Sequence, residues 1–199
     1  MRIAYQDEGA GWGEAAARRV DERAALMPCR TVGEVFVAVD AGLATHGVLP
    51  IETSTTGSLR RNYDALLAHD LPIVAEVELS VGDGERTRFL AVGQALPHAV
   101  ADKTTIVFSL PDEPGALWRA LSVFALRLID LTRLESRPIP GRPWEYVFYA
   151  DLAAATDEVR CVRALEQLAE FVPTLRTLGS YPSWKPRALP MPDPFEMLA

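Results

Sequence analysis

Asp112-Glu-Pro-Gly-Ala-Leu117 and Glu135-Ser-Arg-Pro138 lie within residues 103–182, the stretch that decides the fold of the second half of the chain. Runs of apolar residues with strand patterning alternate there with two segments that have helical spacing. The patterns predict, in order, a strand at 104–110, a helix at 115–128, strands at 129–137 and 144–152, a helix at 157–171 and a strand at 174–181. This βαββαβ order predicts a ferredoxin-like α+β domain over residues 103–182.

The first half of the chain alternates between strand and helix patterns. Gly82-Asp-Gly84 predicts a tight hairpin turn, because such turns need positive φ angles. The alternation predicts a single small α/β lobe over residues 1–95, joined to the second domain by a linker at 94–102. We predict strands at 2–5, 47–51, 72–79 and 87–92 and helices at 14–26, 32–41 and 58–68.

Two threonines are candidates for helix N-caps. Thr31 precedes the helix predicted at 32–41, and Glu34 follows it at the spacing of a capping box. Gly42 is expected to end that helix. Thr156 is expected to cap the helix predicted at 157–171.

The composition argues against several classes of protein. The chain has 199 residues, 49% of them apolar, and a formal net charge of −7, so no basic face for nucleic acid is expected. No apolar run approaches the roughly 20 residues of a membrane span, and no signal segment precedes the first predicted strand. Cys29 and Cys161 lack CxxC spacing and the three histidines, including His98, are scattered. We therefore expect a cytoplasmic protein with free thiols, no metal and no cofactor.

Residues 183–199 are predicted to form a proline-rich tail. Four prolines between positions 186 and 194 disfavour helix and strand pairing. We expect an extended segment that is ordered only where Trp184 or Phe195 docks.

The turn before the helix predicted at 115–128 is a candidate site for a carboxylate. Pro114 and Gly115 stand at the helix entry, where unpaired backbone N–H groups and the helix dipole favour an anion. Leu117 and Trp118 add apolar surface for the side chain of a ligand.

Residues 103–182 resemble the phenylalanine-binding ACT domain of prephenate dehydratases. The resemblance rests on the two motifs quoted above, at their separation, and on Leu178-Gly-Ser-Tyr-Pro182, which is similar to the last strand of that domain. In that family the amino acid binds at a dimer interface, between the Gly-Ala-Leu loop of one chain and the Glu-Ser-Arg-Pro segment of its partner. The alternative is a domain in which these residues shape only a turn and an interface. The resemblance implies a homodimer that binds L-phenylalanine through Gly115, Ala116, Leu117, Glu135, Ser136, Arg137 and Pro138.

Three segments of the first half resemble the catalytic domain of prephenate dehydratase. They are Ile3-Ala-Tyr-Gln6 up to Glu14-Ala-Ala-Ala17, Val48-Leu-Pro-Ile-Glu-Thr-Ser54 and Thr87-Arg-Phe89. That domain has two α/β lobes, like a type II periplasmic binding protein, with prephenate between them. Here the second lobe is missing, and Gly82-Asp-Gly84 stands where the family inserts it. The resemblance therefore implies half of a catalytic domain, with one open face in place of a closed cleft.

The resemblance also implies catalytic residues. Thr87 is the expected donor of a proton to the departing hydroxyl, and Arg88 the expected partner of a substrate carboxylate. The alternative is that Thr87 and Arg88 are ordinary strand residues of a hairpin. The complete set is Glu52, Ser54, Thr87, Arg88 and Phe89.

The first loop departs from the family pattern. Asp7 and Ala10 replace glycines, Gly13 replaces serine or threonine, and Thr53 replaces asparagine. Asp7 would repel a dicarboxylate such as prephenate if it faced the site.

These residues leave three functions open. The first is a shortened prephenate dehydratase, with an enzyme that decarboxylates prephenate without aromatisation as a variant. The second is an inactive regulator that binds phenylalanine, and the third is a dimeric scaffold without a ligand. Kinetics with prephenate separate the first from the others, and amino-acid binding separates the second from the third.

Overall fold

The computed structural model describes residues 1–7, 9–82, 84–97, 99–139 and 141–185. Asp83 of the predicted turn, His98 and the tail from residue 186 onward, with Phe195, lie outside these ranges.

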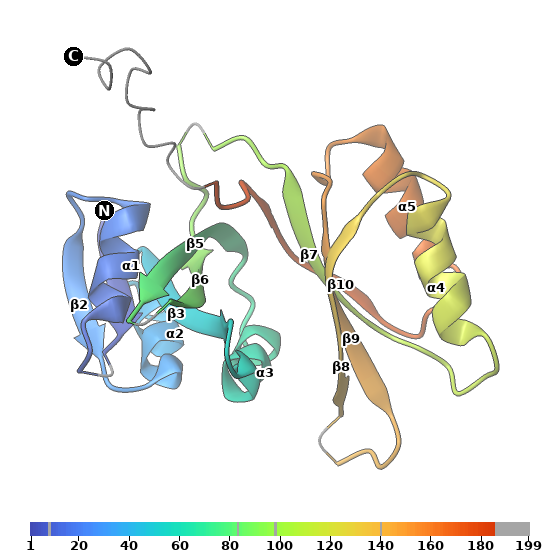
Figure 1. The fold of residues 1–199 in the computed structure, drawn as a ribbon, viewed down its shortest axis with the longest axis horizontal. Helices are drawn as coiled ribbons and strands as arrows, with labels where there is room; N and C mark the ends of the chain where they lie inside the picture. Colours follow the sequence, from blue (N-terminus) through green and yellow to red (C-terminus); the bar gives the residue numbers. More distant parts are fainter. Residues whose placement is uncertain (8, 83, 98, 140, 186–199) are drawn as a thin grey trace, which may run out of the picture.

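The N-terminal lobe is a mixed sheet with helices on both faces (Figure 1). The strand order is β2-β1-β3-β6-β5, with β4 paired to the end of β3. β1 runs parallel to β2 and β3, whereas β6 is antiparallel to β3 and β5. The elements are β1 (Arg2–Gln6), α1 (Trp12–Val20), β2 (Ala25–Cys29), α2 (Val32–Asp40), β3 (His46–Thr53), β4 (Gly57–Ser58), α3 (Arg60–Ala68), β5 (Ile73–Val81) and β6 (Glu85–Gly93).

The C-terminal domain is an antiparallel sheet of order β10-β7-β9-β8. Helices α4 and α5 cover the face of this sheet that points away from the lobe (Figure 1). The predicted α/β lobe followed by a ferredoxin-like βαββαβ domain is therefore confirmed. The elements are β7 (Lys103–Ser109), α4 (Ala116–Ala125), β8 (Leu131–Pro138), β9 (Tyr146–Leu152), α5 (Val159–Ala169) and β10 (Leu175–Tyr181).

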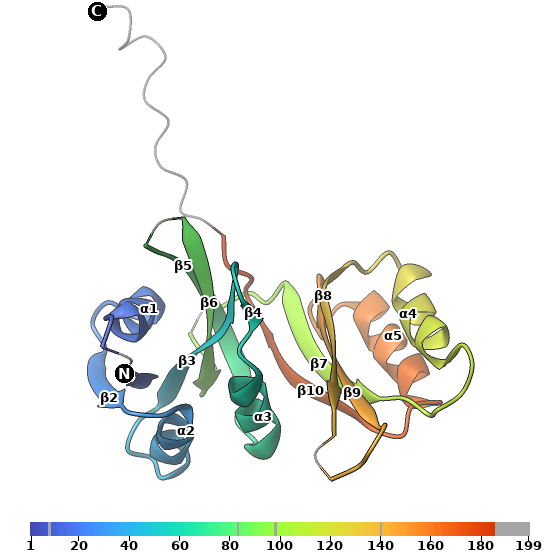
Figure 2. The same cartoon turned by 60° about the horizontal axis from the view of Figure 1, so that its bottom comes forward.

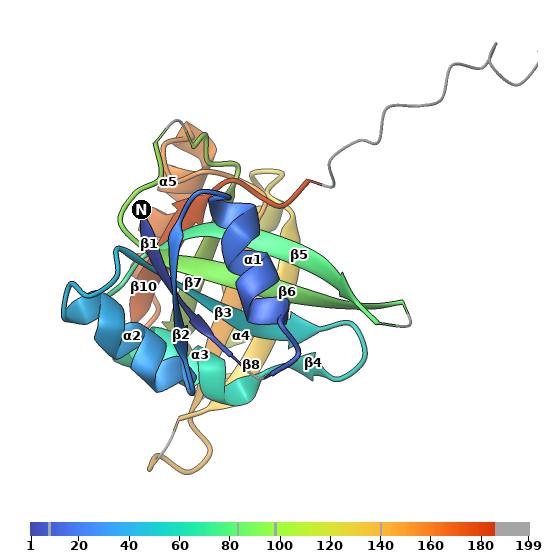
Figure 3. The same ribbon diagram turned by 90° about the vertical axis from the view of Figure 1, so that its left-hand side faces the viewer.

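The other face of the C-terminal sheet packs against the lobe. One apolar cluster contains Leu49 and Leu90 of the lobe sheet together with Tyr149 and Leu178 of the C-terminal sheet. Helix α1 packs on the opposite face of the lobe sheet, as Figure 3 shows from that side. The two sheets thus share a core, and neither domain buries its inner face alone.

The helix predicted at 14–26 is wrong at its C-terminal end. α1 ends at Val20, and Ala25–Cys29 forms β2, which pairs in parallel with β1. Alanine and leucine favour a helix locally, but pairing with β1 satisfies the backbone of this segment and decides its conformation. Pro28 is tolerated because β2 is an edge strand of the described sheet. The short strand β4 is also missing from the prediction.

The two cap predictions have opposite outcomes. Thr31 caps α2, with the Glu34 N–H donating to its Oγ1 at 3.2 Å. Thr156 is wrong as the cap of α5, because the helix begins after Glu158. The Glu158 carboxylate accepts the Ala155 N–H at 2.8 Å, while the Thr156 N–H donates to Ser180 on β10.

Gly179 on β10 sets the distance between the two sheets. A Cβ at this position would lie 2.2 Å from the carbonyl oxygen of Ile73 and 2.7 Å from its backbone nitrogen. Both atoms belong to the backbone of β5, so neither can rotate away. The close approach requires glycine here, which gives a physical reason for the glycine in the segment from Leu178 to Pro182.

Gly179→Ala is expected to destabilise the protein by about 2 kcal/mol or more, because the added methyl group forces the two sheets apart. Gly33→Ala is the matched control: its Cβ has no neighbour closer than Thr31 Oγ1 at 3.8 Å, and alanine favours a helix. Urea unfolding of both variants measures the difference. Equal stability of the two variants would show that the sheets are not in backbone contact in solution.

Candidate functional site

A hollow of about 160 Å³ lies where β1 and β3 end and α1 begins. Gly11 starts α1 with φ 74° and no side-chain cap, so the first N–H groups of the helix are not covered by a capping side chain. Gly13 allows the helix to lie directly on β1, since a Cβ there would sit 2.1 Å from the Gln6 carbonyl oxygen. The lining residues are Gln6, Ala10, Trp12, Gly13, Pro50, Thr53, Leu59, Thr87 and Phe89.

Strand β6 separates the Thr87-Arg-Phe89 motif into two faces. Thr87 and Phe89 line the hollow, and Thr87 is 7% exposed. Arg88 points to the C-terminal domain, as the period of two in a strand requires. Its Nη1 lies 3.3 Å from Glu52 Oε2 and 3.6 Å from Asp151 Oδ2.

Carboxylates surround the guanidinium of Arg88 and stabilise its positive charge. Burial alone would lower the pKa of its guanidinium, but the carboxylates of Glu76, Glu52 and Asp151 together raise it above its ordinary value. Arg88 is therefore a fixed cation that joins the lobe to β9, at the back of the strand that carries Thr87. The hollow itself is lined, among the described residues, by uncharged side chains.

The five residues expected to be catalytic thus divide by position. Thr87 and Phe89 lie in the hollow, while Glu52 and Arg88 face the C-terminal domain. Ser54 joins β3 to β6: its N–H donates to the Arg86 carbonyl at 2.8 Å, and its Oγ accepts the Arg86 N–H at 2.9 Å.

Lys103 extends the buried charges at the domain interface. Its Nζ lies 2.7 Å from Glu76 and 3.8 Å from Asp151. Thr105 Oγ1 donates to Asp151 at 2.7 Å, and the backbone N–H of Trp184 donates to the second oxygen of Glu76 at 2.8 Å. Each acid is therefore paired across the interface: Glu76 of the lobe with Lys103, and Asp151 of the C-terminal domain with Arg88. Buried charges need such partners.

Arg133 on β8 is a residue that the sequence interpretation missed. Its Nη2 donates to Ser58 Oγ at 2.7 Å, and its Nε lies 3.7 Å from Glu52 Oε2. The guanidinium lies 4.2 Å from the ring centroid of Tyr63. Burial raises the pKa of this phenol, against the opposing effect of Arg133, so the ring under the cation stays neutral. The alternation of side chains along a strand could have been used to predict that Arg133 shares one face of β8 with Glu135 and Arg137.

The Glu135-Ser-Arg-Pro138 segment turns two side chains towards the lobe. Glu135 accepts from Ser58 and from Arg133, and Arg137 donates to the Arg60 carbonyl. Arg137 also pairs with Asp64 at 3.1 Å. Ser136 and Pro138 lie on the opposite side of the strand by the same alternation.

The Gly-Ala-Leu segment borders a second hollow of about 510 Å³. Gly115 starts α4 with φ 79° and no side-chain cap, and Ala116 and Leu117 line the hollow. Aromatic, acidic, proline and leucine side chains form the rest of the wall. The lining is Leu110, Pro111, Asp112, Glu113, Ala116, Leu117, Trp144, Glu145, Tyr146, Phe148 and Pro173. Within one described chain, the Glu135 segment is not part of this lining.

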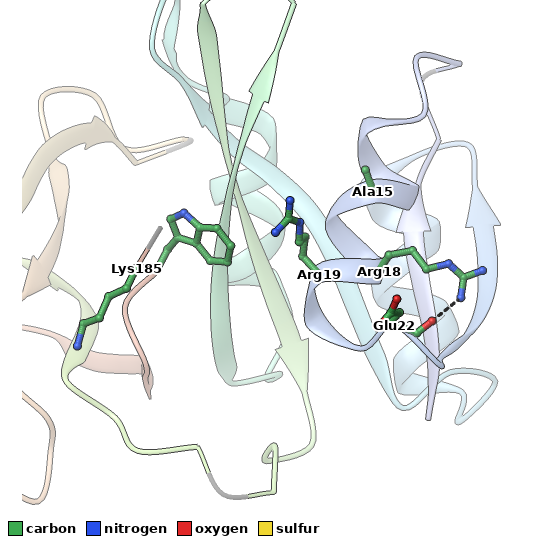
Figure 4. A pocket seen from close by; sticks show the side chains of 6 residues that line it. Ala15, Arg18, Arg19, Glu22 and Lys185 are labelled. Atoms are coloured by element: carbon green, nitrogen blue, oxygen red, sulfur yellow. Dashed lines mark hydrogen bonds between the residues drawn. The ribbon is translucent and has the colours of Figure 1, made fainter. Parts of the chain in front are cut away.

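A third hollow, of about 780 Å³, lies at the far end of α1 (Figure 4). It is lined by Ala15, Arg18 and Arg19 of α1, by Glu22 just after the helix, and by Trp184 and Lys185. Trp184 packs against the lobe core, so the predicted docking of this residue is confirmed. Arg18 already donates to the carbonyls of Glu22 and Ala24, and neither of the motifs reaches this hollow.

Metal binding, thiol chemistry and membrane spanning have little support within the described residues. No group of three His, Cys, Asp or Glu side chains there is arranged to hold a metal ion. Cys29 and Cys161 are buried free thiols whose pKa values are raised by burial. None of the described helices has the length and apolar character needed to span a bilayer.

Comparison with known proteins defines the class of this chain. The prephenate dehydratase family model matches residues 3–84, and the ACT domain model matches residues 104–170. Arogenate dehydratase/prephenate dehydratase 2, chloroplastic, from Arabidopsis thaliana is 31% identical, over 92% of this chain and 73% of the relative. The chain belongs to the prephenate dehydratase family and carries a C-terminal ACT domain.

Solved structures agree with this fold. Prephenate dehydratase from Streptococcus mutans has a TM-score of 0.82 at 32% identity, covering 93% of this chain and 100% of that one. A structure described as GqqA, a novel type of quorum quenching acylase, has a TM-score of 0.81 at 29% identity, covering 90% and 94%. Prephenate dehydratase from Arthrobacter aurescens in complex with L-Phe has a TM-score of 0.79 at 24% identity, covering 92% and 90%.

The alignments also locate a difference in length. The match to the Arabidopsis relative spans 277 positions against the 199 residues of this chain, so stretches of the relative have no counterpart here. The dehydratase match ends at residue 84, in the turn between β5 and β6 and just before Thr87.

Arg88→Met and Asp151→Asn are expected to be non-additive, because each removes one half of a largely buried pair. We expect a coupling energy of about 1–2 kcal/mol from the double-mutant cycle. Arg86 and Glu78 on the same hairpin pair at 2.8 Å with Arg86 62% exposed, and the matching cycle there should give less than about 0.5 kcal/mol. Urea unfolding measures both cycles. Additive effects at Arg88 and Asp151 would contradict the observed pairing.

Proposed function

We propose that this chain binds prephenate in the hollow beside Thr87 and converts it to phenylpyruvate, and that its ACT domain binds L-phenylalanine. One observation carries the catalytic part. Among the described residues the hydroxyl of Thr87 has no hydrogen-bond partner, although the residue is 93% buried and lines the hollow. Such a hydroxyl is available to a ligand.

The hollow supplies the other elements that this reaction needs. The first N–H groups of α1 suit a carboxylate, and Trp12, Leu59 and Phe89 give apolar walls for a ring. Loss of CO2 from the ring supplies the electron pair that expels the ring hydroxyl. Thr87 donates the proton that turns this hydroxyl into water, and recovers a proton from solvent.

Arg88 supports the reaction from behind the strand in this proposal. Its guanidinium is occupied by Glu52 and Asp151, so a substrate carboxylate relies on the helix N-terminus rather than on Arg88. Glu52 and Ser54 then fix β3 and β6 around the hollow, and Thr87 and Phe89 touch the substrate.

We also propose that this chain lacks the second catalytic lobe of the family. β5 and β6 run directly into one another and project as a hairpin at one side of the lobe (Figure 3). The hollow therefore stays open on one side, unless a second chain covers it. An open site stabilises the charge that develops on the reacting substrate less well than a closed one. Two alternatives therefore stand beside the proposal: decarboxylation without aromatisation, and an inactive regulator.

The remaining parts of the proposal concern assembly and location. We infer a homodimer through the ACT domain, with the Ser136 side of β8 facing the Gly115–Leu117 loop of a second copy. The Arthrobacter relative solved with L-Phe supports this ligand for the fold. The acidic composition and the buried free thiols favour the cytoplasm. A structure described as an acylase has the same fold, so the fold alone does not identify the activity, and the proposed function rests on the pocket.

Thr87→Val is expected to lower the turnover of prephenate by about 100-fold or more, because it removes the proton donor but keeps the shape of the side chain. Thr87→Ser should retain most of the activity, and Thr132→Val on β8 is a control outside the hollow. Phenylpyruvate formation and prephenate loss are followed together, with arogenate as a second substrate. Prephenate loss without phenylpyruvate would identify the non-aromatising reaction. Unchanged activity in Thr87→Val would refute the catalytic proposal.

Leu117→Ala is expected to weaken L-phenylalanine binding by about tenfold or more, since it removes an apolar wall of the second hollow. Leu126→Ala is the matched control, because Leu126 follows the same helix, is 78% exposed and does not line the hollow. Isothermal titration calorimetry measures the affinity, and light scattering measures the mass of the complex. No heat of binding in the wild-type protein would remove the sensing function.

A further inference from the structure

We propose that Arg133 is a positioning residue that couples strand β8 of the ACT domain to the pocket wall at residues 53–59. The proposal deepens the proposed function by naming how the pocket is regulated. It rests on that function only in taking the hollow beside Thr87 as the substrate site. Arg133 lies outside both phenylalanine motifs and is not among the described residues that line the hollow.

Arg133 is held almost entirely between the two domains. Its side chain is 8% exposed. The planar guanidinium contacts Ser58 through Nη2 at 2.7 Å and Glu52 through Nε at 3.7 Å, while its face stacks over Tyr63. These three contacts belong to the lobe, although Arg133 itself belongs to the ACT sheet, where it also pairs with Glu135 on the same strand. A forked, delocalised cation can make these contacts together, whereas a lysine cannot.

Two of the residues that Arg133 contacts, Glu52 and Ser58, form the base of the pocket wall. Glu52 and Ser58 face each other across the β3–β4 ladder. Thr53 follows Glu52 on β3 and pairs with Gly57, which precedes Ser58 on β4. Leu59 follows Ser58. Thr53 and Leu59 both line the hollow, and a hydrogen bond of 2.9 Å between Thr53 and Thr56 closes the tip. A shift of Arg133 therefore moves both sides of the segment that faces the substrate.

Strand β8 offers a means to shift Arg133. It is the edge strand of the described ACT sheet, and it lies opposite β4 across the domain interface (Figure 2). Alternate residues point to opposite sides: Arg133, Glu135 and Arg137 to the lobe, and Leu134 and Ser136 away from it. In this proposal, binding at the outer side of the strand shifts the side chains that hold the pocket wall, and the binding of two probes described below measures this coupling.

The charges around Arg133 allow it to be removed without leaving a lone buried acid. Glu52 keeps its pair with Arg88 at 3.3 Å, and Glu135 keeps its hydrogen bond from Ser58. Arg133 is consequently suited to a coupling role that can be separated from folding.

Hydrogen exchange of the full-length protein without ligand tests the structural half of the inference. Arg133→Met should speed amide exchange at residues 53–59 by about tenfold, because hydrogen bonds to a charged group are lost. Ser58→Ala removes the lobe acceptor of Arg133 together with the hydrogen bond from Ser58 to Glu135, and it should change the same segment in the same direction. It covers the case that Arg133→Met does not fold. Arg163→Met, an exposed arginine on α5, is the control and should match the wild type. Unchanged exchange at 53–59 in both Arg133→Met and Ser58→Ala would overturn the inference.

Binding of two probes tests the coupling itself. Phenylpyruvate reports on the hollow beside Thr87, and L-phenylalanine on the ACT domain. In the wild type, saturating phenylalanine should change the phenylpyruvate Kd by about fivefold or more. In Arg133→Met this factor should fall to about one, while the Kd of phenylalanine stays within about twofold, and Arg133→Lys should be intermediate.

The outcomes separate this inference from the proposed function. A wild-type factor that persists in Arg133→Met overturns the inference and leaves the function standing. Wild-type protein that binds both probes without coupling does the same. Wild-type protein that does not bind phenylpyruvate refutes the proposed substrate site, and hydrogen exchange then decides the role of Arg133 alone.

Discussion

The backbone contact between β10 and β5 is the constraint on which the rest of the structure depends. Because Gly179 lets the two strands approach over Ile73, the ACT sheet closes on the lobe without a layer of side chains between them at this point. The charged residues nearby are then buried, Arg88 less completely than the others, and they need partners across the interface. Glu76 meets Lys103, and Arg88 meets Asp151, only when the domains are docked. The two domains therefore specify each other through complementary buried charge as well as through a shared apolar core.

The docking of the two domains explains why the side chains of Thr87-Arg-Phe89 have different surroundings. A strand that is covered on both faces has to use its alternate residues for different purposes. The side towards α1 is hollow and takes the hydroxyl and the aromatic ring, whereas the side towards the ACT domain takes the cation. A motif that is contiguous in sequence thus contributes to two sites. The same holds for Glu135-Ser-Arg-Pro138, whose acidic and basic side chains stabilise the lobe while the intervening residues remain on the outer side.

Most of the fold could be predicted from the sequence because the apolar periods agree with the final topology. β2 could not, because alanine, leucine and proline do not favour a strand, and its conformation depends on pairing with β1. The separation of Arg88 from Thr87 was available from the strand period, but the acid that Arg88 meets lies more than sixty residues away, on another sheet. Arg133 was missed for the same reason: its partners at Glu52 and Ser58 are brought to it only by the docking of the two domains.

Because the described lining of the hollow is uncharged, the shape of the pocket wall matters more for ligand binding than charge does. In a closed two-lobed cleft, fixed charges on both sides can orient a dicarboxylate in a medium that excludes water. Here the described lining supplies helix N–H groups, one buried hydroxyl and apolar walls. In the proposed function, the affinity for the substrate and its orientation then depend on how closely Thr53, Leu59 and Phe89 fit its ring. Because shape rather than charge discriminates between ligands in such a site, a small displacement of residues 53–59 has a large effect on binding. The contacts of Arg133 with the base of that wall connect this sensitivity to the ACT domain.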